Sequence, residues 1–224
     1  GVGTIAGASV KTLGDYTAAN NGRSITNLGT LTLADYGLLG YYGPRIHNAG
    51  TFTAVNATAI TSAGAGLSPF FINTGTFSAV TNFHFNTDYV INLGSLLAQS
   101  GTLTFTSCAF TNHPNSQLSL SATATCDLTG NGLNELNGQI LSPGYNRLRF
   151  LAGNSYLATT NLQTPSLYLL GGYLHQRTNH VVSQINQSAG TWNLLVPCTA
   201  SGYNLTNGEL RGRTLIATNF YWTA

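Results

Sequence analysis

The stretch ITNLGTL at residues 25–31 is the first of four similar phrases in the first hundred residues. Each phrase reads as an apolar residue, any residue, Asn, any residue, Gly, Thr or Ser, and then Leu or Phe. The asparagines follow one another at intervals of 21, 25 and 19 residues. A motif that recurs at such a period is typical of a solenoid, in which each repeat forms one coil. The other three copies are IHNAGTF at 46–52, FINTGTF at 71–77 and VINLGSL at 90–96.

The residues after each Asn-x-Gly alternate between apolar and β-branched polar side chains. Leu31 and Leu33 alternate with Thr30 and Thr32, which is the period-two pattern of a strand with one buried face. Asn and Gly before the strand tolerate positive φ and predict a sharp bend. Gly or Asn interrupts almost every ten-residue window, which disfavours helices. We therefore predict an all-β, single-stranded parallel β-helix, a β-solenoid of roughly ten coils and about 50 Å, in one domain spanning residues 1–224. Its right-handedness is expected from the general rule for parallel crossovers.

The repeated positions predict columns of like side chains, because equivalent residues of successive coils stack about 4.8 Å apart. A buried amide at the corner can donate to the amide carbonyl of the next coil, so we expect a structural ladder of Asn27, Asn48, Asn73 and Asn92. Outward hydroxyls are expected in two flat rows. Their predicted members are Thr30, Thr32, Thr51, Thr53, Thr76, Thr102 and Thr104, with Ser78 at one position.

Composition narrows the classes of function. Only 6% of the residues are charged, the net charge is +2, and 42% are hydrophobic, which is enough for a core. No basic stripe is interleaved with aromatic residues, so nucleic acid is not an expected partner. No run of 18 apolar residues predicts membrane insertion. The neutral surface of Thr, Ser and Asn suits an extracellular or cell-surface location, and the lack of Met and of a signal peptide suggests a mature product or an excised module.

Three cysteines leave two interpretations open. Cys108 and Cys126 lie about one coil apart, so they can face each other on neighbouring coils and form a disulfide. Alternatively, they and Cys198 are small buried thiols. No C-x-x-C spacing predicts a metal site.

The sequence shows no evident catalytic, cofactor or metal site. The acids are dispersed without close pairs, whereas a polysaccharide lyase or hydrolase needs carboxylates that converge on one face. His175 and His180 are spaced for opposite faces of a strand. We therefore expect no enzyme, no metal and no cofactor, although a site assembled across coils stays an alternative. The threonine rows make an ice-binding surface a further alternative. The acids are Asp15, Asp35, Asp88, Asp127, Glu135 and Glu209.

Short phrases along the whole chain resemble the parallel β-helix repeat modules of large secreted or surface-anchored bacterial adhesin-like proteins. They are NAGTF at 48–52, SGTL at 100–103, GGYL at 171–174 and LRGRTL at 210–215, followed by Trp222-Thr223. The resemblance implies a structural or adhesive role and supplies no catalytic residues. In such modules the closing Trp-Thr is followed by a Gly-rich stretch like the beginning of this chain.

These features together predict an extracellular structural protein. A solenoid without an evident cap exposes strand edges, and head-to-tail contact between its two ends propagates into a filament. The expected partners are copies of itself, in a filament or a surface fibre. The nearest alternative is an adhesin for glycans or host surfaces, with Tyr41-Tyr42, Phe70-Phe71 and Tyr221-Trp222 either lining a groove or packing in a core or interface. The expected interface residues are Gly1, Val2, Ile5, Arg211, Arg213, Tyr221 and Trp222, the arginines serving otherwise for solubility and edge protection.

Overall fold

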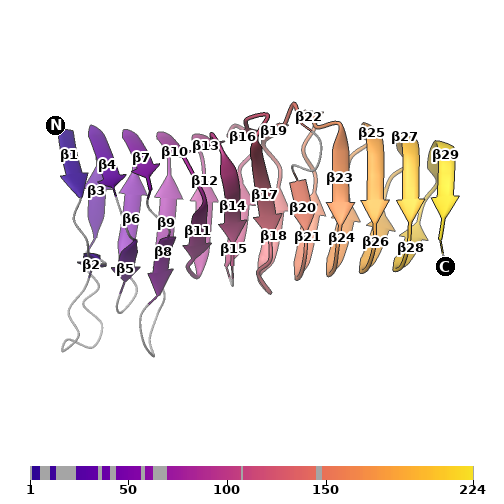
Figure 1. Ribbon diagram of the computed structural model, residues 1–224, viewed down its shortest axis with the longest axis horizontal. Coiled ribbons are helices and arrows are strands. Elements are labelled where there is room, and N and C mark those ends of the chain that lie inside the picture. The colour runs from indigo at the N-terminus through magenta and orange to yellow at the C-terminus, as the bar shows by residue number, and fades with distance from the viewer. Residues whose placement is uncertain are drawn as a thin grey trace.

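The computed structural model describes residues 2–5, 11–13, 24–34, 37–40, 44–56, 59–62, 70–106, 108–144 and 148–223. In these residues the chain is all-β and winds as a parallel β-solenoid of about nine turns, close to the ten predicted. The two termini lie at opposite ends of the stack (Figure 1). Within the described ranges no helix is long and apolar enough to span a membrane.

The coils pass through three parallel sheets, named here A, B and C, and the last coils pass through B and C only. In the coil that begins at Ile25, β3 lies in sheet C, the Asn27-x-Gly29 corner follows, β4 lies in sheet A and β5 in sheet B. Every strand pairs only with its equivalents in the preceding and following coils, and all pairings are parallel. The repeat seen in the sequence is therefore the corner between sheets C and A.

Sheet A has eight strands and ends before the last coils. Its strands are β1 (Val2–Ile5), β4 (Thr30–Ala34), β7 (Thr51–Val55), β10 (Thr76–Ala79), β13 (Ser95–Ala98), β16 (Gln117–Leu120), β19 (Gln139–Leu141) and β22 (Leu162–Gln163).

Sheet B has eleven strands and reaches the C-terminal end. Its strands are β2 (Lys11–Leu13), β5 (Leu38–Gly40), β8 (Ala59–Ser62), β11 (Phe83–Asn86), β14 (Gly101–Phe105), β17 (Ala124–Leu128), β20 (Leu148–Phe150), β23 (Ser166–Leu169), β25 (Val181–Gln187), β27 (Cys198–Leu205) and β29 (Leu215–Trp222).

Sheet C has ten strands. Its strands are β3 (Ile25–Asn27), β6 (Arg45–Asn48), β9 (Phe70–Asn73), β12 (Tyr89–Asn92), β15 (Ala109–Asn112), β18 (Leu133–Leu136), β21 (Asn154–Leu157), β24 (Tyr173–Gln176), β26 (Thr191–Leu194) and β28 (Glu209–Gly212).

One hydrophobic core fills the space between the sheets, and its composition changes along the axis. In the N-terminal region, defined here as residues 24–112, seven phenylalanines form a chain of mostly edge-on or tilted ring contacts with centroids 4.0–6.1 Å apart. In the C-terminal region, residues 148–223, the interior is mainly leucine, with one Trp192–Tyr203 edge contact. The stacked rings are Phe52, Phe71, Phe77, Phe83, Phe85, Phe105 and Phe110.

The glycines of the repeated corner are required by crowding between coils. A Cβ on Gly50 would lie 2.0 Å from the carbonyl oxygen of Gly29, and one on Gly75 would lie 2.1 Å from that of Gly50. None of these corner glycines has positive φ, so the predicted reason for glycine is corrected: space between coils, rather than φ, excludes a side chain. Positive φ occurs instead at the corner between sheets B and C of the C-terminal region, at Gly153, Gly172, Gly190 and Gly208.

The coil becomes shorter near the C-terminus. Successive Asn-ladder residues are 21, 25, 19 and 20 residues apart, whereas strands β23 to β26 pair with the next coil at an interval of 18 residues and β27 pairs with β29 at 17. Sheet A ends at β22, and from β25 onward one long strand of seven or eight residues covers the distance that two strands covered before.

Candidate functional site

The repeated asparagines form a continuous ladder of buried side-chain hydrogen bonds. The Nδ2 of Asn27 donates to Oδ1 of Asn48 at 2.8 Å, Asn48 to Asn73 at 2.7 Å, and Asn73 to Asn92 at 2.8 Å. Each Nδ2 also donates to a backbone carbonyl at the start of the next sheet A strand, such as Thr76 O at 2.8 Å from Asn48. Both amide hydrogens are therefore used, as a buried amide requires.

The ladder has a fifth member that the repeated phrase does not mark. Asn92 donates to Oδ1 of Asn112 at 2.8 Å, although Asn112 is followed by His-Pro and not by x-Gly. Ser116 Oγ donates to the same Oδ1 at 2.9 Å. The column then continues as Leu136, Leu157 and Gln176, so the ladder ends at Asn112.

The threonine rows are shorter than predicted and lie on two sheets. Thr30, Thr51 and Thr76 are in register on sheet A, followed by Ser95, and Thr32 and Thr53 are in register with Ser78 and then Leu97. Thr102 and Thr104 do not continue these rows. They lie on β14 of sheet B, where Thr104 is buried between His84 and Asp127. The alternation of the sequence identified a strand there, but not its sheet.

The cysteines are free and buried. Cys126 is on β17 in register with Leu103 and Leu148, Cys108 lies at the corner before β15, and no disulfide joins them, so the interpretation as free thiols holds. Burial raises the pKa of Cys108 to about 12 and raises the pKa of Cys126 well above its usual value. These thiols, with Cys198, pack as small apolar side chains.

The residues predicted for a subunit interface lie at the two ends of the solenoid (Figure 1). Val2 and Ile5 are in β1, the first strand of sheet A, and Gly1 lies outside the described residues. Arg211 on β28 pairs with Glu209 at 2.5 Å, and Arg213 is exposed. Tyr221 and Trp222 on β29 are 59% and 71% exposed.

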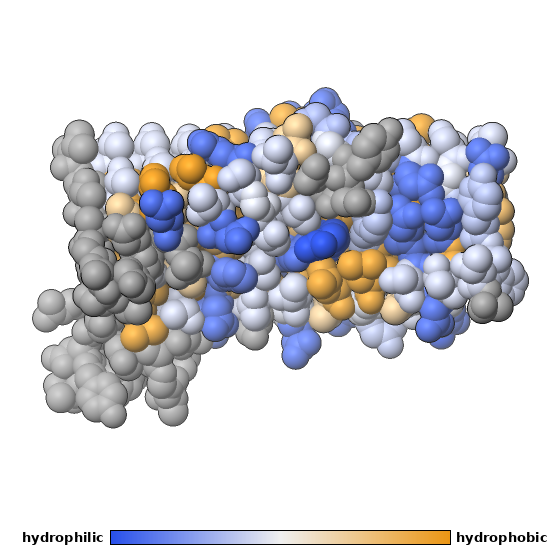
Figure 2. Space-filling view, in the orientation of Figure 1, coloured by the Kyte–Doolittle hydropathy of each residue, from blue (hydrophilic) through white to orange (hydrophobic). Residues whose placement is uncertain are grey.

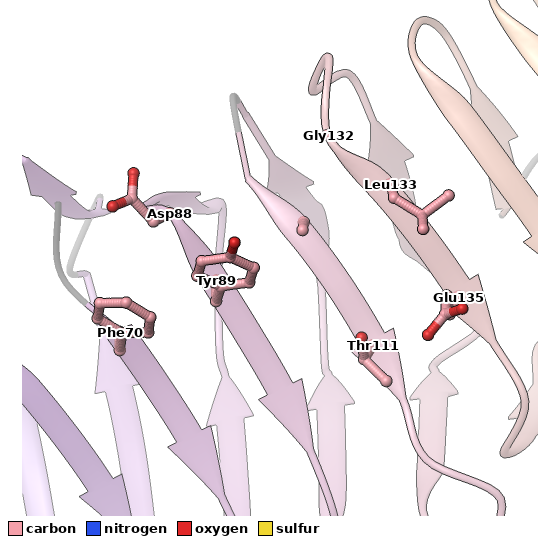
Figure 3. A pocket seen from close by; sticks show the side chains of 8 residues that line it. Phe70, Asp88, Tyr89, Thr111, Gly132, Leu133 and Glu135 are labelled. Carbon is pink, nitrogen blue, oxygen red and sulfur yellow. The ribbon is translucent and has the colours of Figure 1, made fainter. Parts of the chain in front are cut away.

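The outer face of sheet C carries a groove of about 670 Å³ that crosses four coils. Figure 3 shows Phe70 and Tyr89 on neighbouring strands, with Leu133 and Glu135 two strands further along. The strand between them, β15, contributes Ala109 and Thr111. The full lining is Phe70, Asp88, Tyr89, Ala109, Thr111, Gly132, Leu133 and Glu135.

One wall of the groove is aromatic. Phe70 and Tyr89 stack with centroids 5.2 Å apart and an interplanar angle of 13°. On its other side Tyr89 is in register with Ala109, whose single methyl group cannot cover a phenol ring. Tyr89 is 48% exposed and Leu133 on the opposite side is 43% exposed. The groove is therefore a slot between an aromatic ring and an aliphatic side chain, with a small residue as its floor.

Two carboxylates belong to this groove, Asp88 at the start of the aromatic wall and Glu135 on the far strand. They are 47 positions apart in the sequence, so the spacing of the acids along the chain does not indicate that they lie on one groove. Among the described residues, no Lys, Arg or His belongs to the lining of the groove. Tyr41 and Tyr42, the other aromatic pair considered, lie outside the described residues, and Phe71 is buried in the core.

Further along the same face a cation already lies on a tyrosine. The guanidinium carbon of Arg177 is 3.7 Å from the centroid of the Tyr156 ring, and His175 stacks on Tyr156 at 4.8 Å. Tyr156 is the register neighbour of Glu135. Burial, and then the Arg177 charge, lowers the pKa of His175, so the imidazole of this cluster is held neutral.

The two other acids among the described residues, Asp127 and Glu209, each lie in an ion pair. On sheet B, Asp127 makes a two-pronged ion pair with its register neighbour Arg149, with contacts of 2.5 Å. Asp15 and Asp35 lie outside the described residues. Across the described part of the chain, no group of three or more His, Cys, Asp or Glu side chains has the geometry of a metal site.

The hydropathy of the surface is mixed on the side seen in Figure 2. On the side seen in Figure 2, the described residues are mostly pale in the hydropathy colouring, with separate strongly hydrophilic and hydrophobic patches and no continuous apolar band. Comparisons of the chain with protein-family models, with curated proteins and with solved structures find no match.

Proposed function

We propose that the chain is an extracellular structural protein that assembles head to tail into a filament or forms one module of a surface fibre. The observation that carries the proposal is the exposed cross-section of the core at β29. Phe220 is in register with Tyr203, which is fully buried, yet Phe220 is itself 51% exposed. Side chains that every earlier coil buries are thus presented at this end.

The strand lengths at the two ends favour a continuous stack. β29 has eight residues, and β1 and β2 at the other end have four and three. Stacking β1 and β2 of a following coil on β29, and β3 on β28, extends all sheets in parallel. The free N–H and C=O groups of β29 are then paired, and the apolar end is removed from water.

The test is the assembly state of the purified chain, measured by electron microscopy and by sedimentation at increasing concentration. We expect unbranched filaments about as wide as one solenoid. Phe220→Lys places a charge in the end of the core and is expected to prevent assembly. Tyr173→Lys is the matched control, because Tyr173 is 53% exposed but lies on the side of sheet C. A wild-type chain that stays monomeric at high concentration contradicts the filament, and equal assembly by both variants contradicts the end-to-end contact.

Adhesion is a second candidate function, and the groove on sheet C is the observation that favours it. An exposed aromatic wall and polar groups facing one slot are typical of binding surfaces. Glycans are the expected ligands of such an adhesin.

A further inference from the structure

We propose that two copies of this chain pair side by side, in antiparallel orientation, through the outer face of sheet C. The contact surface, called here the sheet C face, consists of the outward side chains of β6, β9, β12, β15 and β18. A two-fold axis along the central strand, β12, relates the two copies. The end strands β1 and β29 do not contribute to this face, so the pairing goes beyond the proposed end-to-end assembly and does not rest on it.

The register of the strands determines which side chains meet in such a pair. The outward side chains form two columns, at the first and the third residue of each strand. Because the axis runs along β12, it turns each column onto itself with the order of the strands reversed. β9 then faces β15 of the second copy, and β6 faces β18. The first column is Arg45, Phe70, Tyr89, Ala109 and Leu133, and the second is His47, Ile72, Ile91, Thr111 and Glu135.

The first argument is that bulk and space match under this rotation. β9 carries the large side chains of Phe70 and Ile72. At the same distance on the other side of the axis, β15 carries the smaller Ala109 and Thr111, which belong to the groove of about 670 Å³ (Figure 3). Phe70 of each copy therefore faces the groove of the other, next to the exposed ring of Tyr89. A face that is complementary to itself in this way is what a two-fold dimer requires.

The second argument is a further match, two strands from the axis. A groove of about 460 Å³ lies over β6, and its lining includes Arg45, His47 and Ile72. Leu133 on β18, which is 43% exposed, faces β6 of the second copy. A protruding apolar side chain is thus opposite a groove here as well, and pairing removes it from water.

The third argument is charge at the rims of the face. Arg45 and His47 lie on β6, and Glu135 lies on β18. Within the described ranges, neither Arg45 nor Glu135 has an ion-pair partner. The antiparallel pair brings Glu135 of each copy to the basic side chains of the other, so both rims are neutralised. Asp88, beside the axis, already interacts within its own chain and does not enter this argument.

The same charges favour the antiparallel over the parallel orientation. A parallel pair would place β6 against β6 and would bring Arg45 against His47 of the second copy. It would also place Phe70 against the equally large Ile72, and would leave both grooves without a matching side chain. Charges at the rim of a contact select orientation more than they add affinity.

Sedimentation equilibrium tests the pairing on the full 224-residue chain carrying Phe220→Lys, which separates it from contact between the ends. We expect a monomer–dimer equilibrium with a dissociation constant of about 10 µM, as for a contact of modest area. A variant that stays monomeric up to about 500 µM overturns the proposal, even where the wild-type chain forms filaments, and leaves the groove open to the glycans of an adhesin.

Further substitutions in the Phe220→Lys chain locate the contact. Ala109→Lys places a charge where Phe70 of the second copy packs, and should weaken pairing at least tenfold. The matched control is Tyr173→Lys, in the same column but four strands from the axis, whereas β3 of the second copy reaches only three. It should leave the dissociation constant unchanged. Circular dichroism checks that both variants fold, and equal weakening by both refutes the sheet C face.

A charge exchange tests the rims. Glu135→Lys alone should weaken pairing about fivefold, because it places a cation opposite Arg45 and His47. Adding Arg45→Glu should restore most of the affinity, since an acid and a base then meet again at each rim. A double variant that pairs as weakly as Glu135→Lys contradicts the proposed contact, and a merely structural effect of the two changes would not produce the rescue.

Spin labels measure the direction of the two copies independently. The native thiols are buried, so a label introduced with Tyr173→Cys reacts at the exposed site. In the antiparallel dimer the two labels are eight strand spacings apart, or about 38 Å, whereas a parallel dimer would bring them within about 20 Å. Pulsed electron paramagnetic resonance distinguishes the two distances. The shorter distance, or none that appears with dimer formation, overturns the antiparallel pair.

Discussion

The N-terminal and C-terminal regions build the same coil with different interiors. In residues 24–112 the corner is held by a buried amide ladder and the core by stacked phenylalanines. In residues 148–223 the same column holds Leu157, Gln176 and Leu194, and the corners between sheets B and C depend on glycines with positive φ. At one of these corners between sheets B and C, the Nε2 of Gln187 donates to the carbonyls of Gly190 and Glu209, both at 3.0 Å. A buried column in a parallel stack is therefore stable with hydrogen-bonded amides or with apolar side chains, provided that each residue finds a matching partner in the neighbouring coil.

The largest expected effect that distinguishes the regions comes from Phe77→Ala. Phe77 touches four other rings, at centroid distances of 5.1–5.4 Å, so its removal leaves a large cavity among rigid side chains. We expect the free energy of unfolding in urea to fall by about 4 kcal/mol. Leu167→Ala, at a buried position of the C-terminal region, is the comparison and should cost about 3 kcal/mol. A smaller loss for Phe77 than for Leu167 would show that the aromatic stack adds no stability.

A next, smaller effect is expected from exchanging residues of the shared column. Asn73→Leu leaves Oδ1 of Asn92 and Nδ2 of Asn48 without their ladder partners, at a cost of about 3 kcal/mol. The reverse change, Leu157→Asn, buries an amide beside Leu136 and should cost a similar amount. Hydrogen exchange should show the increased opening around residues 70–96 for the first variant only. Tolerance of Asn73→Leu would mean that the ladder is dispensable.

As the pH falls, the C-terminal region should lose stability before the asparagine ladder of the N-terminal region does. Burial lowers the pKa of His180 to about 4 from an ordinary 6.5, so the folded state favours the neutral imidazole. The free energy of unfolding is therefore highest above pH 6.5, and it falls by about 2 kcal/mol as the pH falls towards 4. Hydrogen exchange at pH 7 and pH 4.5 measures this region by region. His180→Gln should abolish the pH-dependent difference around residues 178–200, and its persistence in that variant would assign the effect to another group.

The smallest effect is expected at the ion pair between the two regions. Asp127→Asn breaks the contact with Arg149 on sheet B, and because the pair is partly exposed the loss should be about 1 kcal/mol and should shrink in high salt. Glu209→Gln, which breaks the fully exposed pair with Arg211, should cause no measurable change in melting temperature. A large loss in both variants would contradict the assignment by exposure.

The period of the Asn-x-Gly phrase was sufficient to predict the solenoid and four positions of the asparagine ladder, because every coil must return to the same corner. Asn112 was missed because its corner closes through Ser116 rather than Gly. Thr102 and Thr104 were assigned to the wrong rows because period-two alternation is the same on every sheet. The groove could not be predicted at all, since Phe70, Tyr89 and Glu135 meet only after unequal coils are aligned.

The equal coil length between residues 166 and 212 has an evolutionary consequence. Where residues 18 apart occupy equivalent positions, duplication or deletion of one coil leaves the register of all other coils unchanged. Each added copy would lengthen the molecule by about 4.8 Å and place its side chains in existing environments. The unequal coils of the N-terminal region offer no such unit. Growth of this protein by unequal recombination is therefore expected to begin in its C-terminal coils.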